Sequence, residues 1–512
     1  MSEHGFAALL GGKAEIRKVR GHRFFVTILL ADERGHWFSA VLSAPSSGDR
    51  GGAARIEQHT INQIPLDQRH GKARHLFTLW VGANINVLTV VTGALATTLF
   101  GQSFLAGSLA ILIGNLIGTV FMALHAAQGP KLGVPQMVQS RGQFGARGAA
   151  FVVALVVLMY LGYAATALVT GGQSLHAIVP AVSQRFCIGA IGLVSLAAAI
   201  YGHDLIHACT RMMTFIAGGA VVLCYVWVLL VHPVPGSFLT QGSFSPVGFF
   251  KMVSIGAFWQ LGYAPYVSDY SRYLPPDTGP RRAFWACYWG SVVGAVAPMI
   301  LGALIGPAVV DGDVVNAISR LTGPASTAIV LLFAPGVAVA GAICLYGGAL
   351  AVITLVQTFA TGWRAHSRAR ALIATGIFCA ALLIGLQGAT NFLPLYGRFN
   401  EILLYVMVPW TAVNLVDYYL IRRGHYDVPS FFMADGGIYG RYNVAALGCY
   451  LVGILAQVPF IASDVYMGPV ARELGGIDFS WIAGLIVVSA VYFLVVRGRG
   501  VQALAVEGTQ RL

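Results

Sequence analysis

Two apolar segments of the chain carry polar and helix-breaking residues at their centres. Residues 80–86 read WVGANIN, and residues 256–265 read GAFWQLGYAP. Amide side chains and backbone groups freed from a helix can hydrogen-bond a ligand, whereas they are poor nucleophiles, acids or bases. Irregular backbone at membrane depth is tolerated only where it is buried in protein or lines a cavity. The two segments therefore predict a binding site; the alternative is that their glycines serve only close helix packing.

Groups suited to catalysis or metal binding are few and scattered. The seven cysteines occur singly, and no CxxC pair, nucleotide-binding loop, zinc-protease motif or nucleophile elbow stands in a workable context. The acidic residues inside apolar segments are Asp269, Glu401 and Asp417, all near segment ends. We therefore expect no enzyme, no cofactor and no metal site. Asp269 is the candidate for coupling to an ion, and a helix-end contact is the alternative.

The composition is typical of a membrane protein. Of the 512 residues, 57% are hydrophobic and 10% are charged, whereas soluble domains have roughly 45–50% apolar and about 25% charged residues. Because a span takes about 20 apolar residues, the length suits about a dozen spans and excludes a large soluble catalytic domain. We interpret the net charge of +12 as basic loops that orient the spans, not as a nucleic-acid site.

Twelve apolar segments follow His75. They cover residues 76–99, 104–126, 149–171, 186–201, 212–232, 248–268, 283–309, 325–355, 371–386, 399–421, 444–463 and 480–496. When the loops are assigned alternately to two sides, 27 of the 32 Lys and Arg residues lie on one side. Since these residues accumulate on the cytoplasmic side, the sequence predicts twelve membrane helices in the plasma (inner) membrane, with both termini cytoplasmic.

The same segments suggest how the chain is divided. We expect a largely disordered cytoplasmic tail over residues 1–55, a transporter core over 56–421, two additional helices over 422–496 and a C-terminal tail over 497–512. The two interrupted segments are the first and the sixth. Matching interruptions in two halves are typical of inverted-repeat transporters, so the first ten helices are predicted to form two five-helix repeats.

Short motifs spread over about residues 56–465 carry a family resemblance. They are IPL at 64–66, RHGK at 69–72, LWVGAN at 79–84, GYAA at 162–165, GGQ at 171–173, YVSDYSRYLP at 266–275, PW at 409–410, DYY at 417–419, RRGHYDV at 422–428 and GIYGR at 437–441. In this order and spacing they resemble the purine–cytosine permease family, the nucleobase–cation symporters. The resemblance implies an all-α fold like that of the leucine-transporter group, with five plus five helices and two more. It also implies import of cytosine, purines, uracil, allantoin, hydantoins or vitamins with H⁺ or Na⁺.

The resemblance also implies how a substrate is held. In the family a flat ring lies between an aromatic residue of helix three and one of helix six. The matching positions here are Tyr163, after Gly162, and Tyr263, after Gly262. A tyrosine ring keeps a large apolar face for stacking. The alternative is that both tyrosines only pack against neighbouring helices.

The chain departs from the family pattern at the amides that would bind the edge of a base. Helix three usually offers an amide where this chain has Ala167, and the part of helix eight that usually carries asparagine includes Cys344. Polar groups buried without partners cost about 1–3 kcal/mol each. Either other polar residues take over recognition, or the substrate is less base-like than cytosine or a purine. The replacements would be Asn84, Asn86, Gln260 and Thr166. These four residues are expected to surround the substrate together with Gly82, Gly262, Ala167, Cys344 and the two tyrosines.

The coupling ion is predicted from the same resemblance. A sodium site in this fold uses carbonyls of the unwound first helix and hydroxyls of helix eight. Residues 333–339, FAPGVAV, contain no Ser or Thr. Proton coupling is therefore favoured over sodium, with Asp269 as the titrating carboxylate.

The leading interpretation is an importer of a nucleobase or related planar nitrogen heterocycle, which works by cation symport with alternating access. A permease of the same fold for a hydantoin, allantoin or vitamin-like ring is the alternative. A membrane sensor that binds without transport is more remote. The expected partners are the heterocyclic substrate and the lipid bilayer, with no nucleic acid and no obligate protein partner.

Overall fold

The computed structural model describes residues 25–31, 37–43, 61–310, 312–360, 362–363 and 365–509. The chain divides into two units, Met1–Arg55 and Ile56–Leu512. In the first unit, β1 (Phe25–Ala31) pairs antiparallel with β2 (Trp37–Ser43). The disordered tail expected over 1–55 lies mostly outside the described residues, and its described part is this hairpin. Of the C-terminal tail expected over 497–512, the described part continues the last helix, which ends at Thr509.

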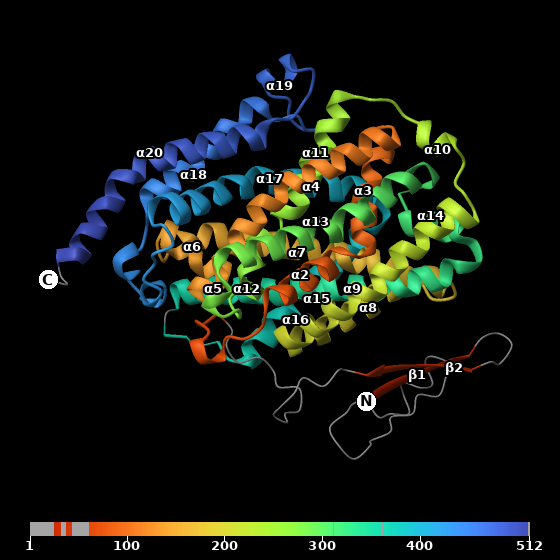
Figure 1. Cartoon of the computed structure of the whole chain (residues 1–512), viewed down its shortest axis with the longest axis horizontal. Coiled ribbons are helices and arrows are strands. Elements are labelled where there is room, and N and C mark those ends of the chain that lie inside the picture. The colour runs from red at the N-terminus through yellow and green to blue at the C-terminus, as the bar shows by residue number, and fades with distance from the viewer. Residues whose placement is uncertain are drawn as a thin grey trace. The chain divides into compact units, whose positions relative to one another are not determined.

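The second unit is helical, and for it the predicted all-α fold is confirmed (Figure 1). Its long helices are α2 (Ala73–Asn84), α3 (Val87–Thr98), α4 (Phe104–Ala126), α7 (Ala149–Ile178), α8 (Gln184–Tyr201), α9 (His203–Val226), α11 (Pro246–Leu261), α13 (Pro280–Ile305), α15 (Ser326–Phe359), α16 (Ser367–Gly388), α17 (Phe392–Leu415), α18 (Val444–Gln457) and α20 (Ser480–Thr509). Shorter helices are α5 (Gly129–Leu132), α6 (Gln136–Phe144), α10 (Ser237–Thr240), α12 (Val267–Ser271), α14 (Val314–Thr322) and α19 (Pro469–Glu473). Each of the twelve predicted apolar segments overlaps at least one of these helices.

By length and apolar composition, eight helical stretches of the described chain could cross a membrane, or nine if a bent pair counts as one span. This number is below twelve partly because α16 and α17 count as one stretch, Ser367–Ile421. The apolar stretch Val444–Phe460 is also not counted, because it is shorter than 18 residues. The protein therefore has several spans, and twelve stays a prediction.

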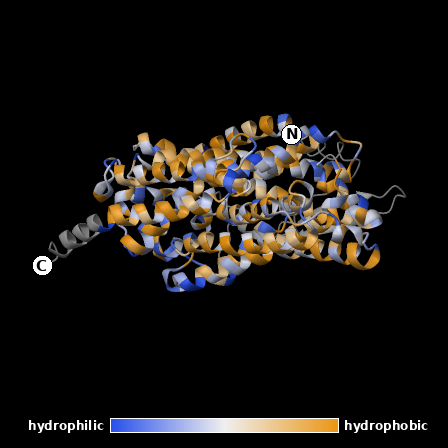
Figure 2. Ribbon diagram, turned by 90° about the horizontal axis from the view of Figure 1, so that it is seen from above, coloured by the Kyte–Doolittle hydropathy of each residue, from blue (hydrophilic) through white to orange (hydrophobic). Residues whose placement is uncertain are grey.

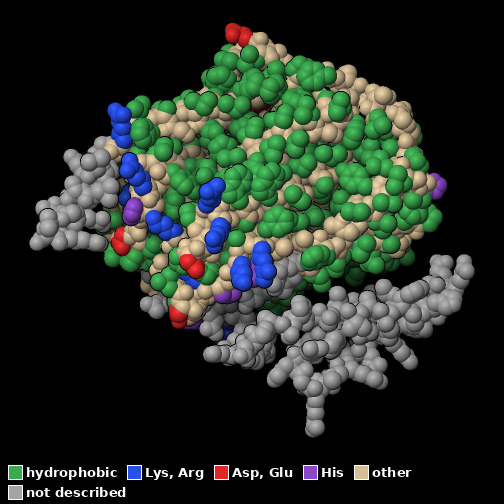
Figure 3. All heavy atoms as spheres, viewed as in Figure 1, with side chains coloured by type: hydrophobic (Ala, Val, Ile, Leu, Met, Phe, Trp, Pro, Cys, Tyr) green, Lys and Arg blue, Asp and Glu red, His purple; other side chains and the backbone are tan. Residues whose placement is uncertain are grey.

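The outer surface of the helical unit suits a lipid environment. Hydrophobic residues are spread along the helices in Figure 2, and they cover most of the face drawn in Figure 3. Lys and Arg gather instead at one end of that face, toward the side where α5 and α6 lie in Figure 1. We call this the basic end and define it by Lys131 of α5, Arg281 and Arg282 at the start of α13, which contacts α5, and Arg422 after η8, two residues before Gly424, which lies next to the Lys131 side chain.

Both segments with polar centres are broken in the structure. The helices α2 and α3 meet at a bend of 58°, with Ile85 and Asn86 between them. The side chain of Asn86 restarts the helix, because its Oδ1 accepts a hydrogen bond from the backbone N–H of Thr89 at 3.3 Å. The second break follows α11, where Gly262, Tyr263 and the short 3₁₀ turn η3 (Ala264–Tyr266) lead into α12.

Glycines allow the broken helices to lie very close to their neighbours. A Cβ atom on Gly118 of α4 would lie 2.1 Å from the carbonyl oxygen of Ala257 on α11. A Cβ on Gly302 of α13 would lie 1.9 Å from the carbonyl oxygen of Val90 on α3. Any larger side chain would push these backbones apart, so α4 and α13 hold the broken helices in place.

The last helices are tied to the core through a buried carboxylate. The chain continues from α17 into the π-helical turn η8 (Val416–Ile421), where Asp417 is fully buried. Asp417 forms an ion pair with Arg422 at 3.1 Å and accepts hydrogen bonds from Tyr426 and, at 2.8 Å, from Tyr492 of α20. In Figure 1, α18 and α20 lie side by side next to α17. Asp417 therefore has a structural role, because it links η8 at the end of α17 to α20.

Candidate functional site

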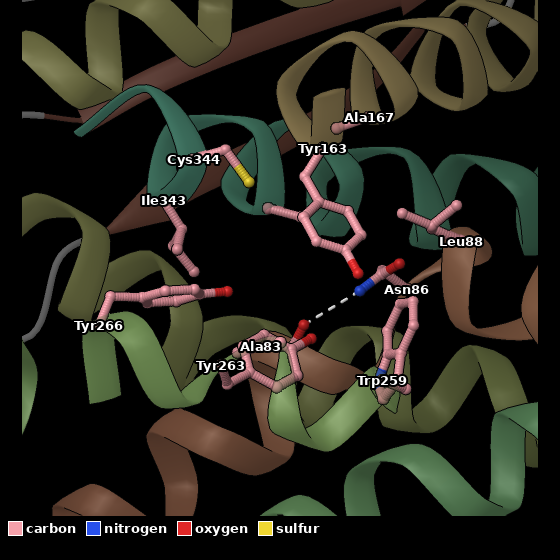
Figure 4. Close-up of a pocket in the computed structure, with 12 residues that line it drawn as sticks. Ala83, Asn86, Leu88, Tyr163, Ala167, Trp259, Tyr263, Tyr266, Ile343 and Cys344 are labelled. Atoms are coloured by element: carbon pink, nitrogen blue, oxygen red, sulfur yellow. Dashed lines mark hydrogen bonds between the residues drawn. The ribbon is translucent and has the colours of Figure 1, made fainter. Parts of the chain in front are cut away.

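A pocket lies where the two broken helices meet α7 and α15 (Figure 4). Its lining residues are Ala83, Asn86, Leu88, Tyr163, Ala167, Trp259, Gly262, Tyr263, Tyr266, Ala340, Ile343 and Cys344. Its volume is only about 40 Å³. This central pocket is therefore narrow, and a bound molecule would touch its walls on most sides.

The two predicted tyrosines belong to this pocket and come from different elements. Tyr163 points into it from α7, and its hydroxyl donates a hydrogen bond to Oδ1 of Asn400 on α17 at 2.8 Å. Tyr263 follows α11 and packs edge-on against Trp80, with ring centroids 5.2 Å apart. Both rings are thus held by partners outside the pocket while they contribute to its wall.

Of the predicted amides, only Asn86 lines the central pocket. Its Nδ2 donates to the carbonyl oxygen of Ala83 at 3.0 Å, the bond drawn as a dashed line in Figure 4. Because Asn86 lies in the break itself, its side chain is not aligned with either helix. Its position at the edge of the space suits contact with the rim of a ring.

The amides of Asn84 and Gln260 belong to a buried network behind the pocket wall. Asn84 Oδ1 accepts from the indole Nε1 of Trp259 at 2.7 Å, and Asn84 Nδ2 donates to Ser291 Oγ at 3.0 Å. Ser291 Oγ donates to Gln260 Oε1 at 2.6 Å, and Gln260 Nε2 donates to Asn115 Oδ1 at 2.7 Å. The chain of bonds joins α2, α4, α11 and α13. It orients Trp259, which does line the pocket.

The remaining predicted residues are divided between the pocket and its surroundings. Gly262, Ala167 and Cys344 line the pocket. Gly82 does not, and a Cβ there would lie 2.0 Å from the carbonyl oxygen of Thr210. The hydroxyl of Thr166 bonds the carbonyl oxygen of Gly162 at 2.8 Å, and Thr166 borders a different cavity with Phe392 and Tyr396.

Asp269 lies on α12, away from the pocket lining. It is 4% exposed, and its Oδ1 accepts a hydrogen bond from the backbone N–H of Gln136 at 2.9 Å. Gln136 is the first residue of α6, where unpaired N–H groups favour a carboxylate. Asp269 thus joins α12, directly after the second break, to α6.

Trp259 and Tyr266 line the pocket although sequence reasoning did not select them. Both stand near Tyr263, four residues before it and three after it, which is the spacing of one helix face. Within the described part of the chain, the hydroxyls of Tyr263 and Tyr266 have no hydrogen-bond partner, and Figure 4 shows the Tyr266 hydroxyl directed into the space. These two phenols are available to pair with polar atoms of a ligand.

Comparison with known proteins places this geometry in a family. Residues 63–484 match the family model described as a permease for cytosine/purines, uracil, thiamine and allantoin. The chain belongs to this family. It is 36% identical over 447 residues to YxlA of Bacillus subtilis, named "Putative purine-cytosine permease". The aligned region covers 87% of this chain and 97% of YxlA. It is 23% identical over 463 residues to the purine-cytosine permease fcyB of Emericella nidulans, with 84% and 86% of the two chains covered.

Solved structures of Mhp1, a nucleobase-cation-symport-1 family transporter, share the fold of this permease. The closed conformation with bromovinylhydantoin bound matches with a TM-score of 0.69 at 18% identity, over 86% of this chain and 94% of Mhp1. The inward facing conformation matches with a TM-score of 0.68 at 17% identity, over 88% and 94%. The predicted leucine-transporter-like architecture is thereby confirmed, as is the prediction of a multi-pass membrane permease rather than an enzyme.

Proposed function

We propose that this permease imports a neutral, planar nitrogen heterocycle of the nucleobase class by cation symport. The observation that carries the proposal is the central pocket, in which Tyr163 and Tyr263 contribute aromatic walls. No Asp, Glu, Lys, Arg or His is among its lining residues. An aromatic pocket without charge favours a neutral ring, because a charged ligand would lose its hydration without gaining a counter-charge.

Recognition of the edge of the ring falls, in this proposal, to Asn86 together with the phenols of Tyr263 and Tyr266. All three can act as donor or acceptor. They replace the amides that the family pattern leads one to expect at Ala167 and near Cys344. Asn84 and Gln260 act as positioning residues, because they do not line the pocket and their amides belong to the buried network.

A hydantoin, allantoin or vitamin-like ring is the second candidate. It is favoured by the apolar residues Ala167, Ile343 and Cys344 on α7 and α15, which offer a purine or cytosine few matched partners. The structurally similar Mhp1 was solved with bromovinylhydantoin bound. A sensor that binds such a ring without moving it is separated from both candidates by an uptake measurement.

The proposed coupling ion is H⁺ rather than Na⁺. The helix α15 passes the first break with Gly336, and a Cβ there would lie 3.2 Å from the carbonyl oxygen of Ile85. Over residues 333–339 this helix has no hydroxyl that could complete a sodium site with that carbonyl. Asp269 remains the candidate for the titrating carboxylate, since it joins the second broken helix to α6.

We further propose that the basic end faces the cytoplasm of a plasma-membrane protein with both termini inside. The Lys and Arg distribution supports this orientation. In this arrangement residues 56–421 form the two-repeat core, and 422–496 add two helices. Rocking of one helix group against the other would open the central pocket to each side in turn.

Uptake into liposomes containing the purified permease tests the proposal. Labelled cytosine, uracil, purines, allantoin and hydantoin are supplied with an inward H⁺ gradient, an inward Na⁺ gradient, or neither. We expect one of these rings to accumulate under the H⁺ gradient, and a protonophore to abolish the accumulation while replacement of Na⁺ by K⁺ does not. Accumulation that needs Na⁺ would contradict proton coupling, and absence of uptake of any bound ring would contradict transport.

A further inference from the structure

A second cavity lies at the basic end, where α6, the end of α15 and the segment after η8 come together. It shares no lining residue with the central pocket. Its volume is about 340 Å³. Its lining includes Arg141, Gln357, Thr358, Trp363 and Ala434. We call it the Arg141 cavity.

Arg141 is a buried cation without a counter-charge. The residue is 5% exposed. Nη1 donates to the carbonyl oxygen of Phe431 at 2.9 Å, and Nη2 donates to the carbonyl oxygen of Thr354 at 2.9 Å and to Thr358 Oγ1 at 3.4 Å. Nε has no acceptor, and no carboxylate forms an ion pair with Arg141 among the residues that the structure describes. Every partner of the guanidinium is therefore neutral.

The charge persists at neutral pH. Burial lowers the pKa of Arg141 from its usual value to about 10, which still leaves the group protonated. A buried positive charge whose partners are all neutral favours the approach of an anion. The guanidinium binds phosphate and carboxylate groups better than other common anions, because its N–H groups match their oxygen atoms.

A second buried arginine, Arg370, serves as a comparison for Arg141, because it lines neither of these cavities. Arg370 is 1% exposed and donates to the carbonyl oxygens of Ala199 and Ile200 at 2.9 and 3.0 Å. Its guanidinium lies 5.5 Å from the centre of the Tyr346 ring, and it lines neither cavity. Hydrogen bonds from a buried guanidinium to carbonyl oxygens at a helix end are thus a structural feature of this fold. Arg141 differs because its charge borders an open polar space.

We propose that the Arg141 cavity binds a phosphate group, with Arg141 as its counter-charge. The proposal rests on the orientation proposed above, which makes the cavity accessible from the cytoplasm. The phosphate belongs to a small soluble molecule or to a lipid headgroup. Gln357 and Thr358 add polar side chains to the wall, and the indole of Trp363 adds a flat face beside them. Occupancy would connect α6, which contacts Asp269, with the end of α15.

Thermal unfolding of the purified full-length permease in neutral detergent tests the site. The melting temperature is measured against sodium phosphate and, at matched ionic strength, against sodium chloride. We expect a saturable rise with phosphate that chloride does not reproduce, because a ligand that binds only the folded state stabilises it. A parallel series compares bilayer discs of phosphatidylcholine with discs that also contain phosphatidylglycerol.

Variants of Ala434 connect the effect to the cavity without removing the bonds of Arg141. Ala434 is exposed at the cavity lining, so substitutions there leave the buried contacts in place. Ala434→Glu supplies a competing carboxylate and should remove the phosphate-dependent rise. Ala434→Gln has a similar size without the charge and should retain it. Arg141→Met should also remove the rise, although loss of its hydrogen bonds lowers the baseline melting temperature.

The outcomes separate the possible sources of the phosphate group. A rise with free phosphate that Ala434→Glu removes assigns a soluble ligand. A rise only with phosphatidylglycerol that Ala434→Glu removes assigns a lipid headgroup. Equal effects of phosphate and chloride together with no lipid effect, or a rise that Ala434→Glu retains, would overturn the proposal. Stabilisation of the same samples by a heterocycle reports on the central pocket, so the two proposals fail independently.

Discussion

The central pocket and the Arg141 cavity offer opposite environments to a ligand. The central pocket is lined by the rings of Tyr163, Tyr263, Trp259 and Tyr266, and its polar groups are neutral. The Arg141 cavity is roomier, and its wall carries a guanidinium whose partners are all uncharged. We propose that the first environment binds a flat neutral ring and the second an anion.

The two cavities also differ in how the chain builds them. The central pocket is built from helix breaks, which allow backbone and side chains from four elements to meet in a small space. The Arg141 cavity is built from a connecting helix and two segment ends. Substitutions in one cavity should therefore leave the other unchanged, and this independence can be measured.

The largest effect is expected from removal of the aromatic walls. Stacking of a base on an aromatic side chain contributes about 1–3 kcal/mol, so Tyr163→Ala or Tyr263→Ala should reduce ligand affinity by about 5- to 150-fold. Uptake should fall accordingly, while phosphate-dependent stabilisation stays as in the parent. Tyr→Phe at the same positions is the matched control and should be milder, because the ring remains. Parental uptake by both alanine variants, with normal amounts in the membrane, would contradict the stacking role.

A smaller effect on ligand affinity is expected from substitution of the amides. It distinguishes Asn86, which lines the pocket, from Asn84 and Gln260 behind the pocket wall. Gln260→Leu removes two links of the buried network and should lower the free energy of unfolding by about 1–3 kcal/mol, with ligand affinity changed by less than about twofold. Asn86→Ala should weaken binding by about 5-fold, equivalent to one lost hydrogen bond of about 1 kcal/mol, and loss of its cap on α3 should also lower the free energy of unfolding by about 1 kcal/mol. Melting curves with and without ligand measure both quantities. A larger loss of affinity in Gln260→Leu than in Asn86→Ala would reverse the assignment.

The smallest effect is expected at Cys344. Cys344 is 8% exposed and lines the central pocket, so a small thiol reagent should reach its thiol slowly and a bound heterocycle should slow the reaction further. Cys344→Ala should change affinity by about threefold or less, because the thiol acts as a small apolar contact. Mass spectrometry of the modified peptide gives the rate, with Cys344→Ala as the labelling blank. Equal rates with and without a saturating heterocycle would place the ligand elsewhere.

Much of the fold could be predicted from the sequence because its signals are local. Apolar segments of helix length, and the polar interruptions at residues 80–86 and 256–265, indicated where helices run and where two of them break. The same interruptions pointed to the pocket. Tyr163 and Tyr263 were selected by family resemblance, and the structure brings both into one cavity.

The direction of individual side chains could not be predicted in the same way. Asn84 and Asn86 are two residues apart, yet one ends a helix and turns into a buried network while the other lies in the break and lines the pocket. The sequence does not specify how far the backbone turns between them. The sequence indicates Arg141 only as one of the charges that orient the spans, because its burial depends on residues more than 200 positions away.

The most direct test of the central claim is thermal stabilisation of the purified permease by a panel of neutral and charged ligands. The panel includes nucleobases, hydantoin, allantoin, ring vitamins and nucleotides, each tested on the parent and on Tyr163→Ala. The account predicts that a neutral planar ring raises the melting temperature of the parent and that Tyr163→Ala loses this response. A panel in which only charged ligands stabilise the parent, or a neutral ring that stabilises Tyr163→Ala equally well, would contradict it.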